Sequence, residues 1–470
     1  MKQPAPVLYA PREPIFPKRV TGTFRRLKWW IMGLTLAIYY LTPWIRWDRG
    51  PNLPDQAVLV DMGSRRFYFF WIEIWPHEFY FVAGLLIMAG LGLFLFTSAL
   101  GRVWCGYTCP QTVWTDLFIL VERWIEGDRN ARVRLHRADW SFRKWRLRLT
   151  KWAVWLTIAI ATGGAWVFYF TDAPTLLHDL FAFTAHPAAY ITIAVLTMTT
   201  FVFGGFMREQ ICIYMCPWPR IQAAMMDPDT ITVAYREWRG EPRGKKHEDT
   251  KGDCIDCMAC VNVCPVGIDI REGQQMECIT CALCIDACDD VMDKIGKPRG
   301  LIDYLALSDE PAERAGEAPK SNWRHVLRPR TLLYTAMWSL IGIGLVYALF
   351  IRSDIELTVS PVRNPVYVVQ SDGAIRNIYD IRLRNKSGDE RQFHLSLISE
   401  DILRISLQGR SDLIVRVPAD STVLQRVYIT ARPQDPPASR DRTDLRLWVE
   451  DITSAARASQ DTVFNGRAPQ

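Results

Sequence analysis

Hydrophobic residues in much of the chain gather into long runs that charged residues do not interrupt. Five runs contain no Asp, Glu, Lys or Arg, and they cover residues 29–45, 79–100, 152–170, 188–206 and 331–351. A helix needs about 20 apolar residues to cross a bilayer, and roughly 17 is the short limit. Trp and Tyr near the ends of the runs are typical of a membrane boundary. The pattern therefore predicts five transmembrane helices.

After the last run the pattern changes to strict alternation of apolar and polar residues. Segments such as IYDIRLRN, FHLSLI and TVLQRVYIT alternate in this way, and turn formers such as NKSGDE and PADS separate them. Several short alternating strands with regular turns are typical of an antiparallel β-sandwich of immunoglobulin type. This region has no Cys and a single His, His394, so we expect neither a disulfide nor an intrinsic metal site in it.

Lys and Arg lie mostly on one side of the predicted helices. They are frequent in 1–28 and 101–151 and absent from 171–187, although the segment 46–76 also contains four Arg. Cytoplasmic segments of membrane proteins are enriched in Lys and Arg. We therefore expect the N-terminus to be cytoplasmic and the C-terminus to be periplasmic. The first helix has no cleavage signal behind it and is expected to stay as an anchor.

The predicted order of domains follows from these patterns. It is a cytoplasmic tail (1–28), a four-helix membrane region (29–206) with a basic cytoplasmic segment (101–151), a cytoplasmic ferredoxin-like domain with linkers (207–330), a fifth transmembrane helix (331–351) and a periplasmic immunoglobulin-like domain (352–470). The formal net charge of +6 is explained by the basic cytoplasmic segments and by contact with anionic membrane lipid. We infer no nucleic-acid partner from it.

Two cysteine motifs in the predicted cytoplasmic domain have the spacing of bacterial two-cluster ferredoxins. CIDCMACVNVCP and CITCALCIDACD both follow the pattern C-x2-C-x2-C-x3-C. Three thiolates of such a motif hold one cubane, and the displaced fourth reaches the other one. One [4Fe–4S] cluster is thus assigned to Cys254, Cys257, Cys260 and Cys288, and the second to Cys278, Cys281, Cys284 and Cys264. Zinc sites do not normally show this spacing, and cytoplasmic thiols stay reduced.

The four remaining cysteines form a second kind of motif. CGYTCP and CIYMCP share the pattern Cys-x-Tyr-x-Cys-Pro, and each follows a predicted helical hairpin. Because Pro110 and Pro217 disfavour helical geometry in the residue before them, each pair is expected where a helix breaks. The candidate site residues are Cys105, Cys109, Cys212 and Cys216, which converge if the two hairpins are related by pseudo-symmetry.

Thiolates and thioethers favour Cu(I). Copper is therefore one candidate ion for the four thiols, with Met215 as a further ligand. A third cubane and small buried thiols without a ligand are the alternatives. None of the seven His lies inside an apolar run, so we do not expect a membrane haem with His ligands. The sequence also has no nucleotide-binding fingerprint.

The motif-bearing segments resemble those of the CcoG/FixG family, also called RdxA. The most specific stretches are GRVWCGYTCPQTVWTD, ICIYMCPWPRIQ and the double ferredoxin motif from Asp253 to Tyr304. The resemblance implies a multi-pass iron–sulfur protein of the bacterial inner membrane that supports assembly of cbb3-type cytochrome c oxidase. It also implies reduction of Cu(II) to Cu(I).

The leading hypothesis is therefore a membrane cupric reductase. Its partners would be copper ions, a cytoplasmic electron donor, and oxidase assembly factors or copper chaperones. The alternatives are a quinol-linked electron conduit of the polyferredoxin type and a non-enzymatic assembly scaffold.

Overall fold

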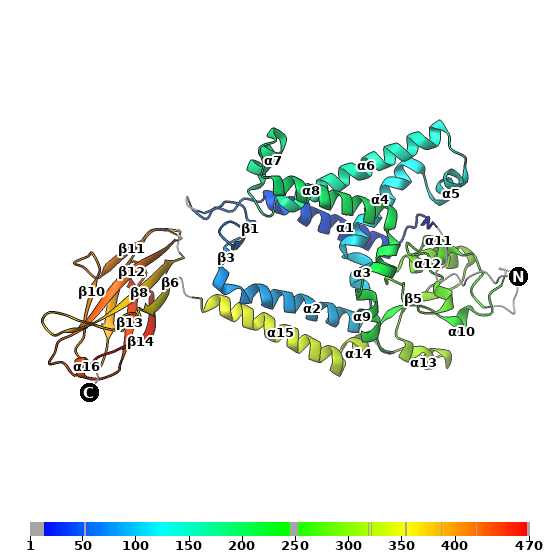
Figure 1. The fold of residues 1–470 in the computed structure, drawn as a ribbon. Helices are drawn as coiled ribbons and strands as arrows, with labels where there is room; N and C mark the ends of the chain where they lie inside the picture. Colours follow the sequence, from blue (N-terminus) through cyan, green and yellow to red (C-terminus); the bar gives the residue numbers. More distant parts are fainter. Residues whose placement is uncertain are drawn as a thin grey trace, which may run out of the picture. The chain divides into compact units, whose positions relative to one another are not determined.

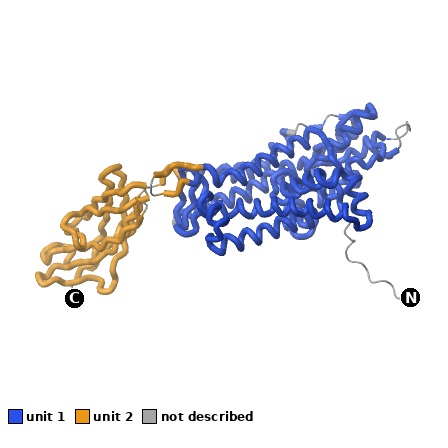
Figure 2. Tube along the Cα trace, turned by 90° about the horizontal axis from the view of Figure 1, so that it is seen from above, with its two compact units in different colours: residues 1–45, 56–345 blue, residues 46–55, 346–470 orange. Residues whose placement is uncertain are grey.

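The chain divides into two compact units in its computed structural model (Figure 2). The structure describes residues 14–50, 53–244, 252–317, 319–320, 322–352, 355–386, 388–419 and 421–467. The first unit comprises Met1–Ile45 and Gln56–Leu345, and the second comprises Arg46–Asp55 and Val346–Gln470.

The first unit is built on long helices (Figure 1). These are α1 Thr23–Leu41, α2 Tyr80–Leu100, α4 Pro110–Glu126, α6 Phe142–Val167, α8 Pro187–Thr200, which continues as the π-helix η3 Phe201–Met207, and α15 Pro329–Phe350. Shorter helices lie between them: α3 Val103–Tyr107, α5 Arg129–Arg137, α7 Ala173–Ala182 and the π-helix η4 Ile211–Met215.

Three helices of the described residues, not five, are long and apolar enough to cross a membrane. They are Tyr80–Leu100, Pro187–Met207 and Pro329–Phe350. The prediction of five was wrong because two apolar runs extend beyond their helices. Helix α1 ends at Leu41, just before Pro43, so that only residues 29–41 form uncharged helix. Helix α6 starts with a charged segment and ends at Val167. Both uncharged stretches fall short of roughly 17 residues.

Glycines allow the long helices to approach one another closely. A Cβ atom on Gly84 of α2 would lie 2.6 Å from Leu345 Cδ2 of α15, and these two helices run side by side in Figure 1. A Cβ atom on Gly163 of α6 would lie 2.8 Å from the carbonyl oxygen of Ile193 in α8. Small residues at helix contacts let the backbones pack closely without a large side chain between them.

A small antiparallel sheet forms in the segment that precedes α2. It consists of β1 Val58–Asp61, β2 Arg66–Phe69 and β3 Ile72–Ile74, and it is followed by the short helix η2 Pro76–Glu78. Arg66 pairs with Glu73 at 3.2 Å and stacks on the Trp75 ring. Part of the basic charge that broke the expected pattern in segment 46–76 is therefore neutralised locally.

The cysteine-rich region folds as short elements at one end of the long helices (Figure 1). They are α9 Trp218–Met225, β4 Thr232–Tyr235, α10 Glu237–Gly240, α11 Ala259–Val263, η5 Ile270–Glu272, α12 Leu283–Ile295, β5 Ile302–Leu305, η6 Leu307–Asp309, α13 Glu310–Arg314 and α14 Asn322–Val326. Strands β4 and β5 pair antiparallel. The region is attached to the helices by backbone bonds such as the one from Ile231 N–H to the Ala99 carbonyl, 3.1 Å long.

The second unit is a sandwich of two antiparallel sheets. One sheet has the order β10-β12-β8-β6 with β7 paired to β8, and the other has the order β11-β9-β13-β14. The strands are β6 Ile355–Pro361, β7 Val368–Val369, β8 Ile375–Asn385, β9 Arg391–Ile398, β10 Arg404–Leu407, β11 Ile414–Val417, β12 Ser421–Ala431, β13 Thr443–Asp451 and β14 Arg457–Phe464, with a short helix α16 Pro436–Ser439. Alternate residues of β8 point into the core, where Tyr379, Leu383 and Phe393 are fully buried. The predicted β-sandwich is confirmed.

Candidate cluster and four-thiol sites

The two ferredoxin-like motifs fold into matching loops. The second and fourth residues after the first Cys of each motif have left-handed backbone geometry, and these are Asp256 (φ 52°), Met258 (φ 57°), Thr280 (φ 54°) and Ala282 (φ 59°). Helix α11 or α12 begins directly after each loop. Backbone that alternates between left- and right-handed geometry forms a concave nest of N–H groups, which favours an anionic cluster. The local spacing of the cysteines therefore produces the same cradle twice.

Two small cavities gather the eight cysteines into the sets predicted from their spacing. The first cavity is lined by Cys254, Cys257, Cys260 and Cys288. The second is lined by Cys264, Cys278, Cys281 and Cys284, and Cys260 also touches it. In each set, three cysteines come from one motif and the fourth comes from the other motif. Apolar side chains such as Val266 and Ile302 complete the linings and exclude water.

Backbone N–H groups favour the thiolate forms in the second set. Those of Val266 and Ile268 lower the pKa of Cys264, and that of Thr280 lowers the pKa of Cys278. Burial nevertheless raises the pKa of the Cys264 thiol to about 12. A cysteine binds iron as the thiolate, so binding of an iron–sulfur cluster has to release the proton of each thiol. The residues thus fit [4Fe–4S] clusters, which supply one-electron redox chemistry when bound.

The Cys-x-Tyr-x-Cys-Pro motifs interrupt helices as predicted. Cys105 lies in the short helix α3, and Cys109 is extended with ψ 128° immediately before α4. Cys212 lies in the π-helix η4, and Cys216 ends it with ψ 123°. The prolines that follow Cys109 and Cys216 explain both breaks.

The fold brings the four thiols within electrostatic reach of one another. The pKa of Cys212 is raised to about 12, first by burial and then by the sulfurs of Cys109, Cys105 and Cys216. The pKa of Cys105 rises to about 11 for the same reasons, burial being the larger cause. All four are half-buried free thiols. The two motifs thus lie close enough for their sulfurs to interact electrostatically, and we call this group the four-thiol site; joint binding of one ion by the four thiols stays a prediction.

The four-thiol site is not closed around a single ion. Across the residues that the structure describes, no group of three or more His, Cys, Asp or Glu side chains is gathered tightly enough to hold one metal ion, and this includes the cysteines of the two cluster cradles. The side chain of Met215 is 53% exposed. Its role as a ligand stays a prediction.

The first thiol motif lies directly against the second cluster loop. A Cβ atom on Gly106 would lie 2.6 Å from the Ile279 carbonyl oxygen and 3.0 Å from the Cys281 Cα atom. The Tyr107 hydroxyl donates a hydrogen bond to the Cys281 carbonyl at 3.2 Å. No residue therefore separates the backbone that carries Cys105 from the backbone that carries Cys281.

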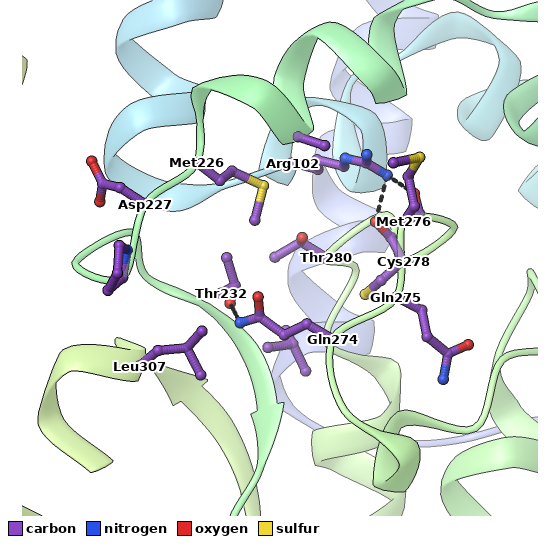
Figure 3. A pocket seen from close by; sticks show the side chains of 13 residues that line it. Arg102, Met226, Asp227, Thr232, Gln274, Gln275, Met276, Cys278, Thr280 and Leu307 are labelled. Carbon is purple, nitrogen blue, oxygen red and sulfur yellow. Dashed lines mark hydrogen bonds between the residues drawn. The ribbon is translucent and has the colours of Figure 1, made fainter. Parts of the chain in front are cut away.

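Arg102 is a functional candidate that the sequence analysis missed. It is buried and donates hydrogen bonds to the carbonyls of Met276 and Cys278, next to an open pocket of about 510 Å³ (Figure 3). Burial lowers the pKa of Arg102, whereas the sulfurs of Cys105 and Cys278 raise it. Its charge therefore acts on both the four-thiol site and the second cluster loop. In sequence it was only one of many Arg in a basic segment.

Gln222 is a second residue of this kind. Its amide oxygen accepts a hydrogen bond from the Cys105 thiol at 3.2 Å, and its amide nitrogen donates to Thr97 at 3.1 Å. Gln222 therefore orients Cys105 from helix α9, and no local signal in the sequence marked it.

Comparison with known proteins shows close relatives over nearly the whole chain. "Protein RdxB" from Cereibacter sphaeroides is 70% identical over 465 residues, covering 98% of both chains. The chain belongs to the CcoG/FixG family. "Protein RdxA" from the same organism is 66% identical and covers 94% of this chain and 95% of its own. The "Nitrogen fixation protein FixG" of Rhizobium meliloti is 54% identical, and the match covers 97% of this chain and 94% of FixG.

Three family models match segments of this CcoG/FixG chain. A 4Fe-4S dicluster domain matches residues 207–307, and an IG-like fold at the C-terminal of FixG matches residues 345–467. A 4Fe-4S binding domain matches residues 81–128, where Cys105 and Cys109 are the only cysteines. The protein is therefore an iron–sulfur electron-transfer protein of an oxidoreductase family, and its thiol motifs lie within the matched regions.

Proposed function

We propose that this CcoG/FixG protein reduces Cu(II) to Cu(I) at the four-thiol site, for assembly of cbb3-type cytochrome c oxidase. The observation that carries the proposal is the contact of Gly106 and Tyr107 with the loop of Cys281. Each Cu(II) takes up one electron, and a reduced cytoplasmic donor supplies it. Soft thiolates favour Cu(I) over Cu(II), so the four sulfurs suit the product of the reaction.

The residues around the site have separate roles in this proposal. Arg102 places a positive charge beside both groups of sulfurs, which stabilises their anionic forms. Gln222 holds the Cys105 thiol in one orientation. The thiols are half-buried, so they are partly shielded from water but still accessible. Copper chaperones or oxidase assembly factors would then receive Cu(I).

The same proposal places the protein in the bacterial inner membrane. The helix ends next to the cysteine-rich region carry many Lys and Arg, which supports a cytoplasmic location for this end. The N-terminus would then be cytoplasmic and the immunoglobulin-like domain periplasmic. Accessibility of single introduced cysteines to a membrane-impermeant thiol reagent tests this topology.

The decisive experiment replaces all four thiols by Ser in the full chain. The protein is purified without oxygen, reduced, and mixed with Cu(II) and a chelator specific for Cu(I). We expect the quadruple variant C105S/C109S/C212S/C216S to lose at least about tenfold in copper reduction while its ferredoxin-like clusters keep their absorbance. Unchanged copper reduction would reject the four-thiol site as the place of reaction.

A third [4Fe–4S] cluster at the four-thiol site is the second candidate. The match of a 4Fe-4S binding domain to residues 81–128 favours it, because Cys105 and Cys109 are the only cysteines of that segment. Iron analysis separates the two candidates. Two cubanes contain about eight iron atoms per chain and three contain about twelve. If the quadruple variant loses about four iron atoms, the thiols hold a cluster; if its iron is unchanged, they are free for copper.

A further inference from the structure

A cavity of about 590 Å³ lies apart from the cysteine sites, among helices α4, α5, α6 and η3 and residues 14–16. Basic and aromatic side chains dominate its lining. The basic ones are Arg132, Lys144, Arg148, Lys151 and Arg208, and the Trp are Trp140, Trp152 and Trp155. The function proposed for the cysteine sites does not use this cavity.

The positive charges around the cavity outnumber the carboxylates. Glu122 is shared by Arg132, by Lys151 at 3.2 Å and by Arg208 at 2.6 Å. Glu126 pairs with Arg148 at 3.1 Å and with Lys151 at 2.9 Å.

Lys144 is buried and donates to the carbonyls of His136 and Ala138, at 3.1 and 2.5 Å. Even if Glu209, which also lines the cavity, is counted, five cations face three carboxylates. Buried charge without a counter-charge is costly, so the site favours an additional anion.

Arg132 shows where such an anion would bind. Its side chain is 1% exposed, and one of its nitrogens pairs with Glu122. Its other two nitrogens, Nε and Nη1, are buried and have no hydrogen-bond partner. The guanidinium also lies over the Phe16 ring, 5.2 Å from its centre. Buried N–H groups are nearly always satisfied, so these two call for an acceptor in the cavity.

The cavity lies where the apolar helices end. Trp152 starts the uncharged part of α6, and Gly205 and Phe206 belong to the last turn of the candidate membrane span Pro187–Met207. Trp and basic residues at such a boundary are typical of contact with lipid head groups. Arg and Lys bind phosphate oxygens through charge-assisted hydrogen bonds, and Arg does so with two parallel donors.

We propose that this cavity binds a phosphate group, held by Arg132, Lys144 and Arg148 and flanked by Trp140 and Trp152. The head group of an anionic phospholipid and a free phosphate compound share this chemistry. Binding would join α5 and α6 to α4, the helix that begins at Cys109. The proposal does not depend on the function proposed for the four thiols.

The test uses the full chain in neutral detergent. Phosphatidylglycerol is the anionic lipid probe, phosphatidylcholine the lipid without net charge, and pyrophosphate the soluble probe. Binding is followed by native mass spectrometry and by the midpoint of thermal unfolding. At a concentration about 100-fold above its dissociation constant, the true ligand is expected to raise the midpoint by about 5 °C.

The pattern of responses identifies the source of the phosphate. A one-to-one adduct and a shift with phosphatidylglycerol, but not with pyrophosphate, assign a lipid. A shift with pyrophosphate assigns a soluble phosphate compound. No difference between phosphatidylglycerol and phosphatidylcholine, together with no response to pyrophosphate, overturns the proposal.

Variants R132Q and R148Q are expected to weaken binding at least tenfold. R143Q and R146Q are matched controls, because both residues lie on α6 with exposed side chains and neither lines the cavity. R132Q also loses the ion pair with Glu122, so its binding data are used only if the variant unfolds cooperatively. If it does not, the binding measured for R148Q decides the test. Equal weakening by the controls would show general surface charge and would overturn the site.

Discussion

At the scale of single residues, Gly106 and Arg102 connect the two kinds of cysteine site. Gly106 lets the first thiol motif touch the backbone at Ile279 and Cys281. Arg102 places one charge beside sulfurs of both sites. Neither residue carries a redox group, yet both lie where the first thiol motif meets the second cluster loop. Substitutions at these two positions are therefore informative.

Gly106→Ala is expected to separate the thiol motif from the cluster loop. The new Cβ atom would meet backbone atoms at 2.6 and 3.0 Å, which cannot move as a flexible side chain can. Overpacking of this kind costs about 1–3 kcal/mol. Rapid mixing of reduced protein with Cu(II) should show slower copper reduction.

Gly90→Ala is the matched control, because a Cβ atom on this α2 glycine would meet nothing within 4 Å. Equal rates for both variants and the wild type would contradict the importance of the contact.

Arg102→Gln is expected to lower the reduction potential of the second cluster. Removal of a nearby positive charge disfavours the reduced, more negative state, by roughly 50–100 mV for an effective dielectric constant of about 20. Redox titration followed by electron paramagnetic resonance measures the change. Arg102→Lys keeps the charge and should restore most of the potential, and the first cluster should not respond. A potential unaffected by Arg102→Gln would exclude the electrostatic role.

At the scale of elements, helix α4 and the π-helices η3 and η4 position the four-thiol site. Helix α4 begins directly after Cys109 and carries Glu122 three turns later, where three cations hold it. The second thiol motif lies largely within the π-helix η4 and follows the π-helix η3, and Arg208 between the two helices has a positive φ of 43°. Irregular turns of this kind occur often at functional sites because they redirect side chains. Helix α4 and the segment between η3 and η4 are thus joined by the Glu122–Arg208 ion pair, which lies outside the four-thiol site.

Glu122→Gln is expected to destabilise the first unit by about 3–5 kcal/mol. The substitution leaves Arg132, Lys151 and Arg208 buried with less counter-charge, and breaking a buried ion pair typically costs this much. Chemical unfolding followed by Trp fluorescence measures the loss. A change below about 0.5 kcal/mol would mean that the cations do not depend on Glu122.

The stability contributed by Glu122 should also depend on pH. Burial alone would raise the pKa of Glu122, but Arg208, Arg132 and Lys151 outweigh burial and lower it to about 2. The folded protein therefore holds this carboxylate ionised more strongly than the unfolded chain, with its ordinary pKa of about 4.5. The contribution is fully present above pH 4.5 and is lost as the pH falls through 2. The difference in the free energy of unfolding between the wild type and Glu122→Gln should decrease in the same way as the pH falls. A difference that does not change with pH would contradict this role of Glu122.

At the scale of the whole molecule, the two units have separate cores. The core of the second unit comes from both sheets of the sandwich and contains no Cys. Its stability is therefore expected to be independent of the clusters in the first unit. This separation allows the two units to be perturbed one at a time.

Leu447→Ala is expected to destabilise the immunoglobulin-like domain by about 2–5 kcal/mol, because its side chain is fully buried in the core. Cluster absorbance and copper reduction should not change. Leu424→Ala serves as the control, since that Leu is 59% exposed and its loss should cost little. Loss of cluster absorbance in Leu447→Ala would show that the units are coupled.

The sequence alone predicted the two cluster-ligand sets, whose role stays a prediction, as well as the β-sandwich and the helix breaks at the thiol motifs. These features depend on local spacing: two residues between thiols, strict alternation in strands, and Pro after Cys. Only the tertiary structure decided how much of each apolar run is helical, and it reduced the candidate spans from five to three. It also placed Tyr107 against Cys281, which is 174 residues away. Contacts of such long range arise from packing and leave no periodic signal in the sequence, and the same holds for the cations around Glu122.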